Sequence, residues 1–129
     1  MTNLEIYDAA LRLASEIPLS DTNEDYEARA PYLLAMICHR YAPLDRVYRL
    51  VHGLEEQELL PITHLPLQIQ FPLSEPFLAP VSTALAALLV LEENPQLSKS
   101  LAELEGEMIH EIRAGIPFQK ETIVSRYDL

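Results

Sequence analysis

The chain has 129 residues, of which 20 are acidic and 9 basic, and its formal net charge is −11 at neutral pH. Hydrophobic residues make up 49% of it, which is typical of a folded domain and excludes a chain that is disordered by composition. No Lys or Arg occurs between Arg49 and Lys99. Because nucleic-acid binding needs cations that displace counterions from phosphates, we expect no nucleic-acid partner.

The first predicted element is a helix over residues 3–16. The sequence "TNLE" at 2–5 has the spacing of a capping box, in which Thr2 caps the helix and Glu5 reaches back to the cap. Helical spacing then predicts a buried stripe made of Leu4, Tyr7, Leu11 and Ala14.

A second helix is predicted from a cap at residue 22 or 23 to about residue 41. Pro31 lies inside its apolar pattern, so we expect a kink there or a helix that restarts at the preceding residue. Pro43 fits the first position of a separate short helix, "PLDRVYRLVHG", for which Gly53 is a natural C-terminal stop.

The segment "LPLQIQFPL" at 65–73 alternates apolar residues with glutamines and prolines. This period of two predicts an extended strand with one buried face, and the two prolines place the strand at an edge because they lack hydrogen-bond donors. Its partner is either a hairpin arm, "LLPITH" at 59–64, or a neighbouring chain. The apolar positions are Leu65, Leu67, Ile69, Phe71 and Leu73.

A helix over about 77–93 follows, and it is apolar on two sides. One side carries large residues such as Leu85 and Leu89, and the other carries small ones such as Ala84 and Ala87. Such a helix has to be covered on both sides. Its apolar run of 15 residues from Phe77 to Leu91 is shorter than the roughly 20 that span a bilayer, so we expect no membrane segment.

The pair Asn94-Pro95 predicts a cap and the first turn of a further helix, which Gly115 stops. Its predicted stripe is Leu97, Leu101, Leu104, Met108 and Ile112. We expect the whole chain, 1–129, to form one mainly α domain with a C-terminal tail at 116–129. That domain is a small bundle of four to five helices with one short β-hairpin or extended edge strand at about 59–73.

Few residues suggest chemistry. Cys38 is the only cysteine and sits in an apolar run, so an internal disulfide is impossible and a buried structural thiol is expected. "EMIH" at 107–110 is a single Glu-x-x-His, half of a di-iron pattern, and is more simply a surface acid beside a partly packed histidine. We therefore expect no catalytic residue, no cofactor and no metal site.

One patch combines basic and aromatic residues: Arg40, Arg46 and Arg49 with Tyr41 and Tyr48 interleaved. Two interpretations are open. The arginines pair with the many acids of the chain itself, or they contact an acidic surface on a partner or a neighbouring copy.

The stretch "FPLSEPFLAPVSTALAALLVLEENPQLSKSLAELEGEMIHEI" resembles the head–tail connector (adaptor) proteins of tailed phages and prophages. The likeness consists of a strand that ends in Phe-Pro-Leu, an Ala/Leu-rich helix, an acidic-Asn-Pro break and a second helix. "EDYEARAPYLLAMICHRYAPLDRVYR" and "IPFQKETIVSRYDL" are also similar to that group, so that the resemblance covers roughly residues 20–128.

The resemblance implies a non-enzymatic, mostly helical subunit whose copies form a ring between portal and tail. Its partners would be other copies of itself and the portal and tail proteins. It would occur in the bacterial host cytoplasm during assembly and in the virion of a functional phage. The small face around Ala84 and Ala87 and the tail 116–129 are carried over as contact regions. The individual interface candidates are Leu65, Leu67, Ile69, Phe71, Leu73, Arg46, Arg49, Phe118, Ile123, Val124 and Tyr127.

Two other hypotheses stay open. One is a small acidic helical module of a bacterial cell that binds and regulates another protein, presenting its acids to a basic site. The other is a small helical enzyme or metal protein that uses Glu107 and His110.

Overall fold

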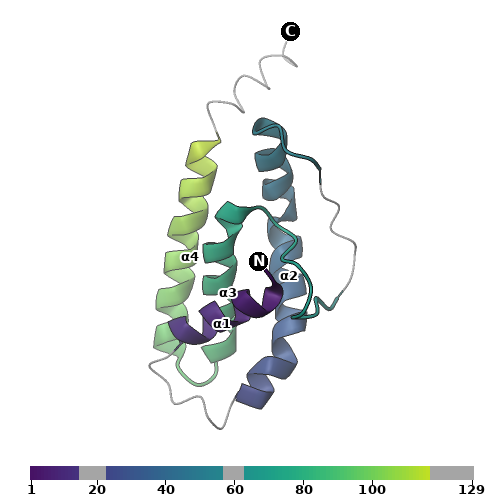
Figure 1. Ribbon diagram of the computed structural model, residues 1–129. Helices are drawn as coiled ribbons and strands as arrows, with labels where there is room; N and C mark the ends of the chain where they lie inside the picture. The colour runs from purple at the N-terminus through teal and green to yellow at the C-terminus, as the bar shows by residue number, and fades with distance from the viewer. Residues whose placement is uncertain (15–22, 57–62, 117–129) are drawn as a thin grey trace.

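The computed structural model describes residues 1–14, 23–56 and 63–116. This part of the chain is mainly helical, as predicted (Figure 1). Its helices are α1 (Asn3–Leu13), α2 (Asn23–Val51), α3 (Leu78–Val90) and α4 (Pro95–Gly115), and a 3₁₀ turn, Glu75–Phe77, leads into α3. The described ranges contain no strand, so neither the predicted β-hairpin nor the alternative extended edge strand is seen in them; residues 59–62 of the first hairpin arm lie outside these ranges.

Helix α3 is the centre of the fold. Ten of its 13 residues are buried, and it packs against α1, α2 and α4 (Figure 1). On its small side, the backbone carbonyl of Ala87 accepts a 2.7 Å hydrogen bond from the Ser98 hydroxyl of α4. The prediction that this helix is covered on both sides is confirmed, because both Leu85 and Ala84 are buried.

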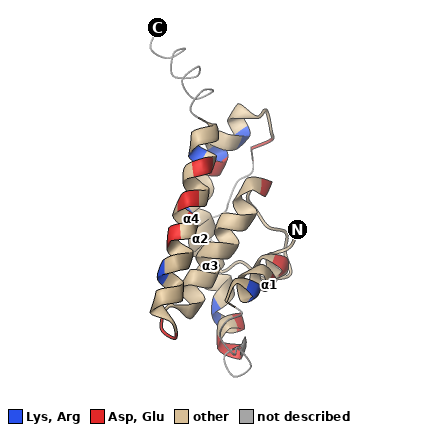
Figure 2. Ribbon diagram, turned by 90° about the vertical axis from the view of Figure 1, so that its left-hand side faces the viewer, with Lys and Arg blue, Asp and Glu red and all other residues tan. Residues whose placement is uncertain are grey.

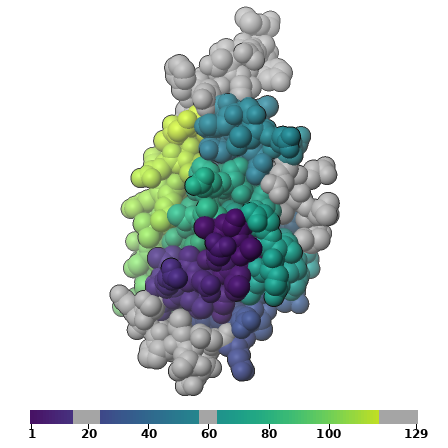
Figure 3. All heavy atoms as spheres, in the orientation of Figure 1, coloured from purple at the N-terminus to yellow at the C-terminus, as the bar shows by residue number. Residues whose placement is uncertain are grey.

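Helix α1 lies across α3 on the face that Figure 3 shows. The capping box is present: the Glu5 N–H donates to the Thr2 hydroxyl, and the Glu5 carboxylate accepts from the Thr2 N–H. The predicted stripe is only partly right. Tyr7 and Ala14 are buried, but Leu4 is 44% exposed and Ile6 takes its place in the core. The position of α3 determines which side of α1 is buried, and the spacing of apolar residues in the sequence does not reveal that position.

Helix α2 is one continuous helix of 29 residues with both Pro31 and Pro43 inside it, so the predicted restart at Pro43 is wrong. A proline in a helix costs about 3 kcal/mol. We attribute the presence of Pro43 inside the helix to packing. Tyr41 and Asp45, on either side of Pro43, are both buried, and an uninterrupted helix keeps their side chains on one face.

The end of α2 follows the prediction. Gly53 has a positive φ of 67°, and the Gly53 and Leu54 N–H groups donate to the carbonyls of Leu50 and Arg49. This arrangement is a Schellman motif, which satisfies the last carbonyls of a helix and favours glycine.

The segment 63–74 pairs with the N-terminus of the same chain. The N–H of Phe71 donates to Met1, and the N–H groups of Asn3 and Leu4 donate to Ile69 and Leu67, at 2.7–2.9 Å. The contact contains one isolated antiparallel bridge, between Thr2 and Gln70. The predicted burial of every second side chain in 65–73 is largely confirmed, because four of the five apolar positions are buried, namely Leu65, Leu67, Phe71 and Leu73.

Helix α4 starts as predicted, with the Asn94 side chain accepting a 3.1 Å hydrogen bond from the Leu97 N–H and Pro95 in the first turn. Leu101 and Ile109 are buried against the core, whereas Leu104 of the predicted stripe is 38% exposed. The opposite side of α4 is exposed and acidic, with Glu103, Glu107 and Glu111 along it (Figure 2).

Candidate interaction surface

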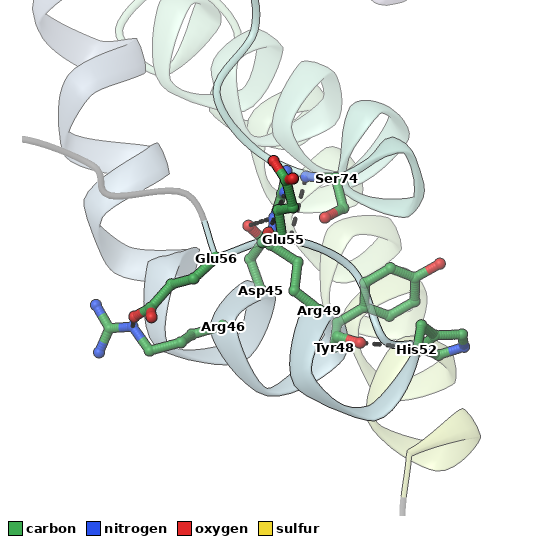
Figure 4. Close-up of polar contacts among 8 residues, drawn as sticks. All are labelled: Asp45, Arg46, Tyr48, Arg49, His52, Glu55, Glu56 and Ser74. Atoms are coloured by element: carbon green, nitrogen blue, oxygen red, sulfur yellow. Dashed lines mark hydrogen bonds and ion pairs between the residues drawn. The ribbon is translucent and has the colours of Figure 1, made fainter.

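A buried carboxylate connects the second half of α2 with the segment that leads into α3 (Figure 4). Asp45, 3% exposed, accepts from the Ser74 N–H at 3.1 Å and from Arg49 Nε at 3.0 Å. Arg49 also donates from Nη1 to the Glu55 carbonyl at 3.0 Å. A buried charge is stable only when it is paired and hydrogen-bonded. These contacts therefore hold both the segment after α2, at Glu55, and the segment before α3, at Ser74, against α2.

The three arginines of the basic-aromatic patch therefore lie in different environments. Only 16% of the Arg49 side chain is exposed, and it pairs with Asp45 within the chain, which agrees with the first interpretation. Arg40 pairs with Glu105 of α4 at 2.9 Å. Arg46 remains on the surface with 64% of its side chain exposed, 3.9 Å from Glu56, which is 72% exposed (Figure 4). An ion pair of this kind contributes little to stability.

The other interface candidates fall into three groups: core residues, one exposed residue and residues outside the described ranges. Leu65, Leu67, Phe71 and Leu73 fill the chain's own core, so these four side chains are not part of its surface. Ile69 is 42% exposed. The candidates Phe118, Ile123, Val124 and Tyr127 lie outside the described residues.

The surface that the sequence patterns did not single out is the outer face of α2. We define it by Tyr32, Met36, Pro43, Arg46 and Leu50, which recur every three, four or seven residues and are all exposed. The exposed fractions of its large apolar members are 58% for Tyr32, 52% for Met36 and 68% for Leu50. A second helical wheel, drawn through the residues left over from the core stripe, would have found them.

This outer face has an unusual charge. Between residues 28 and 51 the only carboxylate is Asp45, and it is buried. None of the five residues that define the outer face of α2 is therefore acidic, although Glu56 lies 3.9 Å from Arg46.

A groove of about 640 Å³ lies between α1, α3 and α4, and α2 contributes none of its lining residues. We call it the α1 groove. Its apolar lining includes Ile6, Leu13, Leu78 and Met108. Glu5, Asp8, Arg12 and Met1 also line it, so that both acidic and basic groups are present there.

A second cavity, of about 430 Å³, lies between α2 and α4. Glu105 reaches into this region, where its carboxylate accepts from the Tyr41 hydroxyl and pairs with Arg40. Burial raises the pKa of Glu105, and the nearby Arg40 lowers it in part. This network ties α2 to α4 and offers no nucleophile.

Reactive groups are scarce in the described residues. Cys38 is buried, as predicted; burial, and secondly Asp45, raise its pKa to about 12, which keeps the thiol protonated and unreactive at neutral pH. In the described ranges no three His, Cys, Asp or Glu side chains are grouped to hold a metal ion. Glu107 and His110 are both exposed on α4.

None of the helices in the part of the chain that the structure describes is both long and apolar enough to cross a membrane. Comparisons of the chain with models of protein families, with curated proteins and with solved structures find no match.

Proposed function

We propose that this chain is a non-enzymatic structural protein of a tailed phage or prophage. It would act like a head–tail connector, joining other copies of itself and the portal and tail proteins in a ring. The observation that carries the proposal is the outer face of α2, where large apolar side chains are exposed on a helix that is otherwise packed into the core.

The apolar residues on this face form a ridge that Arg46 interrupts between Pro43 and Leu50. Tyr32 and Leu50 are 18 positions apart along one helix, which corresponds to roughly 27 Å at 1.5 Å per residue. Single apolar residues on a surface are ordinary, but several large ones exposed along one face of a helix favour a contact with another molecule.

Charge supports the same surface. Two copies of a chain with a net charge of −11 repel each other. The five residues that define the outer face of α2 include no carboxylate, and Arg46 among them offsets the adjacent Glu56, so another acidic surface can approach this face with less of that repulsion. The mainly helical fold also agrees with the kind of subunit that the resemblance implies.

The proposal is tested by measuring molar mass with light scattering as the concentration rises to about 1 mM, together with electron microscopy for rings. At that concentration even weak association is detected. We expect concentration-dependent oligomers, and we expect Met36→Glu to abolish them because it places an acid in the ridge.

The matched control is Leu91→Glu, since Leu91 is 51% exposed, lies at the end of α3 and is not part of the ridge. It should assemble like the wild type. A wild-type chain that stays monomeric over the whole range would contradict assembly and favour the regulatory module.

A further inference from the structure

We infer that α1 is exchanged between copies in the assembled state, so that the first residues and α1 of one copy dock on α3 and the segment 63–74 of a neighbouring copy. They take there the place that they occupy in their own chain in the structure. This inference rests on the proposed function, because assembly brings the copies together. It adds the element through which neighbouring copies are linked.

The contacts that hold α1 join residues that are far apart in the sequence. The N–H groups of Asn3 and Leu4 donate to the carbonyls of Ile69 and Leu67. The Asn3 side chain donates to the Pro66 carbonyl, and the helix packs against α3. None of these contacts involves the chain that directly follows α1, so the α1 of another copy can make every one of them.

The place that α1 occupies is specific for this helix. Ile6, Tyr7 and Ala10 are buried there. A copy whose own α1 has undocked exposes apolar surface on α3, the Phe71 N–H and the carbonyls at 66, 67 and 69. Such groups need a partner that offers apolar side chains and backbone hydrogen bonds together. A second copy of α1 meets both needs.

Helix α1 can leave its place while the rest of the bundle stays folded. It has 11 residues and lies on the outside of the molecule (Figure 3), whereas α2 and α4 each pack directly against α3. Eight residues, 15–22, connect Ala14 with Asn23 in the sequence. A connection of that length spans at most roughly 30 Å, which exceeds the roughly 8–10 Å between packed helices. Helix α1 can therefore reach an adjoining copy.

Exchange is favoured because it requires no new kind of contact. The hydrogen bonds and buried side chains of α1 are the same whether it docks on its own chain or on another. The balance then depends on the local concentration of docking sites, which an assembly raises to about the millimolar range. Separate copies with a net charge of −11 repel each other, and exchange links them through contacts that each chain already contains.

Disulfide trapping between two different chains tests the exchange. Thr2 and Gln70 form the antiparallel bridge, and the hydrogen bonds on either side of it make them a non-hydrogen-bonded pair. The Cα atoms of such a pair lie about 4.5 Å apart, which a disulfide can span. Thr2→Cys chains and Gln70→Cys chains are mixed at about 1 mM, incubated and oxidised. We expect a linked dimer of one chain of each kind.

The matched control is a mixture of Thr2→Cys with Glu111→Cys, which places the second thiol on the exposed side of α4. It should give no linked dimer, and the native Cys38 is buried. If the mixture with Gln70→Cys links no better than this control mixture, the exchange is wrong.

The chain that carries both Thr2→Cys and Gln70→Cys separates the two proposals. Oxidised at low concentration, it forms the disulfide within one chain and fixes α1 on its own docking site, while the outer face of α2 is unchanged. The oxidised chain should need about tenfold more protein or above to assemble than the same chain in reductant. The reduced chain is the control for the loss of the Thr2 cap, and circular dichroism checks that both forms are folded.

The outcomes distinguish failure of the exchange from failure of assembly. If the oxidised and reduced forms assemble alike, the exchange of α1 is wrong and assembly through the outer face of α2 stands. If the wild type is monomeric at about 1 mM and the mixture of single variants forms no link, both proposals are wrong.

Discussion

Replacing Asp45 by alanine should strongly destabilise the protein while leaving its fold recognisable. Asp45 is 3% exposed and accepts hydrogen bonds from the Ser74 backbone and from Arg49. Only 16% of the Arg49 side chain is exposed. Removing the carboxylate therefore takes away the counter-charge of a largely buried guanidinium and the acceptor of a buried N–H.

The expected cost follows from these contacts. Removing one partner of a buried ion pair costs about 3–5 kcal/mol. Arg49 keeps its hydrogen bond to the Glu55 carbonyl, so we expect the lower end, about 3 kcal/mol. Asp45→Asn should cost less, about 1.5–3 kcal/mol, because its amide oxygen can still accept from Ser74 while the charge is lost.

Urea unfolding followed by circular dichroism measures the effect. With a slope of about 1–3 kcal/mol per molar urea, a loss of 3 kcal/mol lowers the midpoint by about 1–3 M. The control is Glu56→Gln, which removes the carboxylate of the exposed Arg46 pair and should change stability by less than about 0.5 kcal/mol. If Asp45→Ala costs no more than Glu56→Gln, the reasoning about burial is refuted.

Three further results are expected. Gly53→Ala should destabilise the protein by about 1 kcal/mol because Gly53 has a φ of 67°. Gly106→Ala, inside α4 with open space around it, should instead stabilise it by about 0.5–1 kcal/mol. Urea unfolding measures both changes in the free energy of unfolding, and changes of the same sign would contradict this reasoning. Cys38, with its pKa raised to about 12, should react with a thiol reagent only in denaturant, and complete labelling of the folded protein within minutes would contradict its burial. Glu105 has a pKa raised by burial, so the folded state holds its proton more tightly than the unfolded state. The stability of the wild type, relative to that of Glu105→Gln, should therefore fall as pH rises above about 4.3. Free energies of unfolding from urea titrations that depend on pH in the same way for both proteins would refute this prediction.

The sequence predicted those features that depend on near neighbours. The capping box of Thr2 and Glu5, the Asn94 cap and the stop at Gly53 each involve residues within a few positions of one another. Their chemistry is local, so reading it requires no knowledge of the fold. The double-sided apolar pattern of α3 was readable for the same reason, and it placed that helix at the centre.

Features that depend on distant partners were not predictable. The alternation in 65–73 shows which side chains are buried, but nothing in it identifies Met1 and Asn3 as the hydrogen-bonding partners. Pro43 is a helix breaker by local rules, yet the packing of Tyr41 and Asp45 on either side of it prevails.

The candidate surface shows the same division. Hydrophobic residues at 65–73 were interpreted as interface candidates, and four of the five proved to be core. The outer face of α2 was overlooked because Met36 and Leu50 occur beside other apolar residues in the sequence, where burial in the core is the default expectation. Only the direction of α2 relative to α3 decides which of its apolar side chains meet solvent.

The pairing of the first residues with the segment 63–74 also has a consequence for biosynthesis. The buried Asn3 side chain donates a 3.0 Å hydrogen bond to the Pro66 carbonyl, and that residue leaves the ribosome 63 positions later. At about 5–20 residues per second this is a wait of roughly 3–13 s. Helix α1 has only 11 residues, too few to be stable alone in water. Residues 1–13 are therefore made well before the segment that they pair with, and until that segment emerges Ile6 and Tyr7 remain available to chaperones.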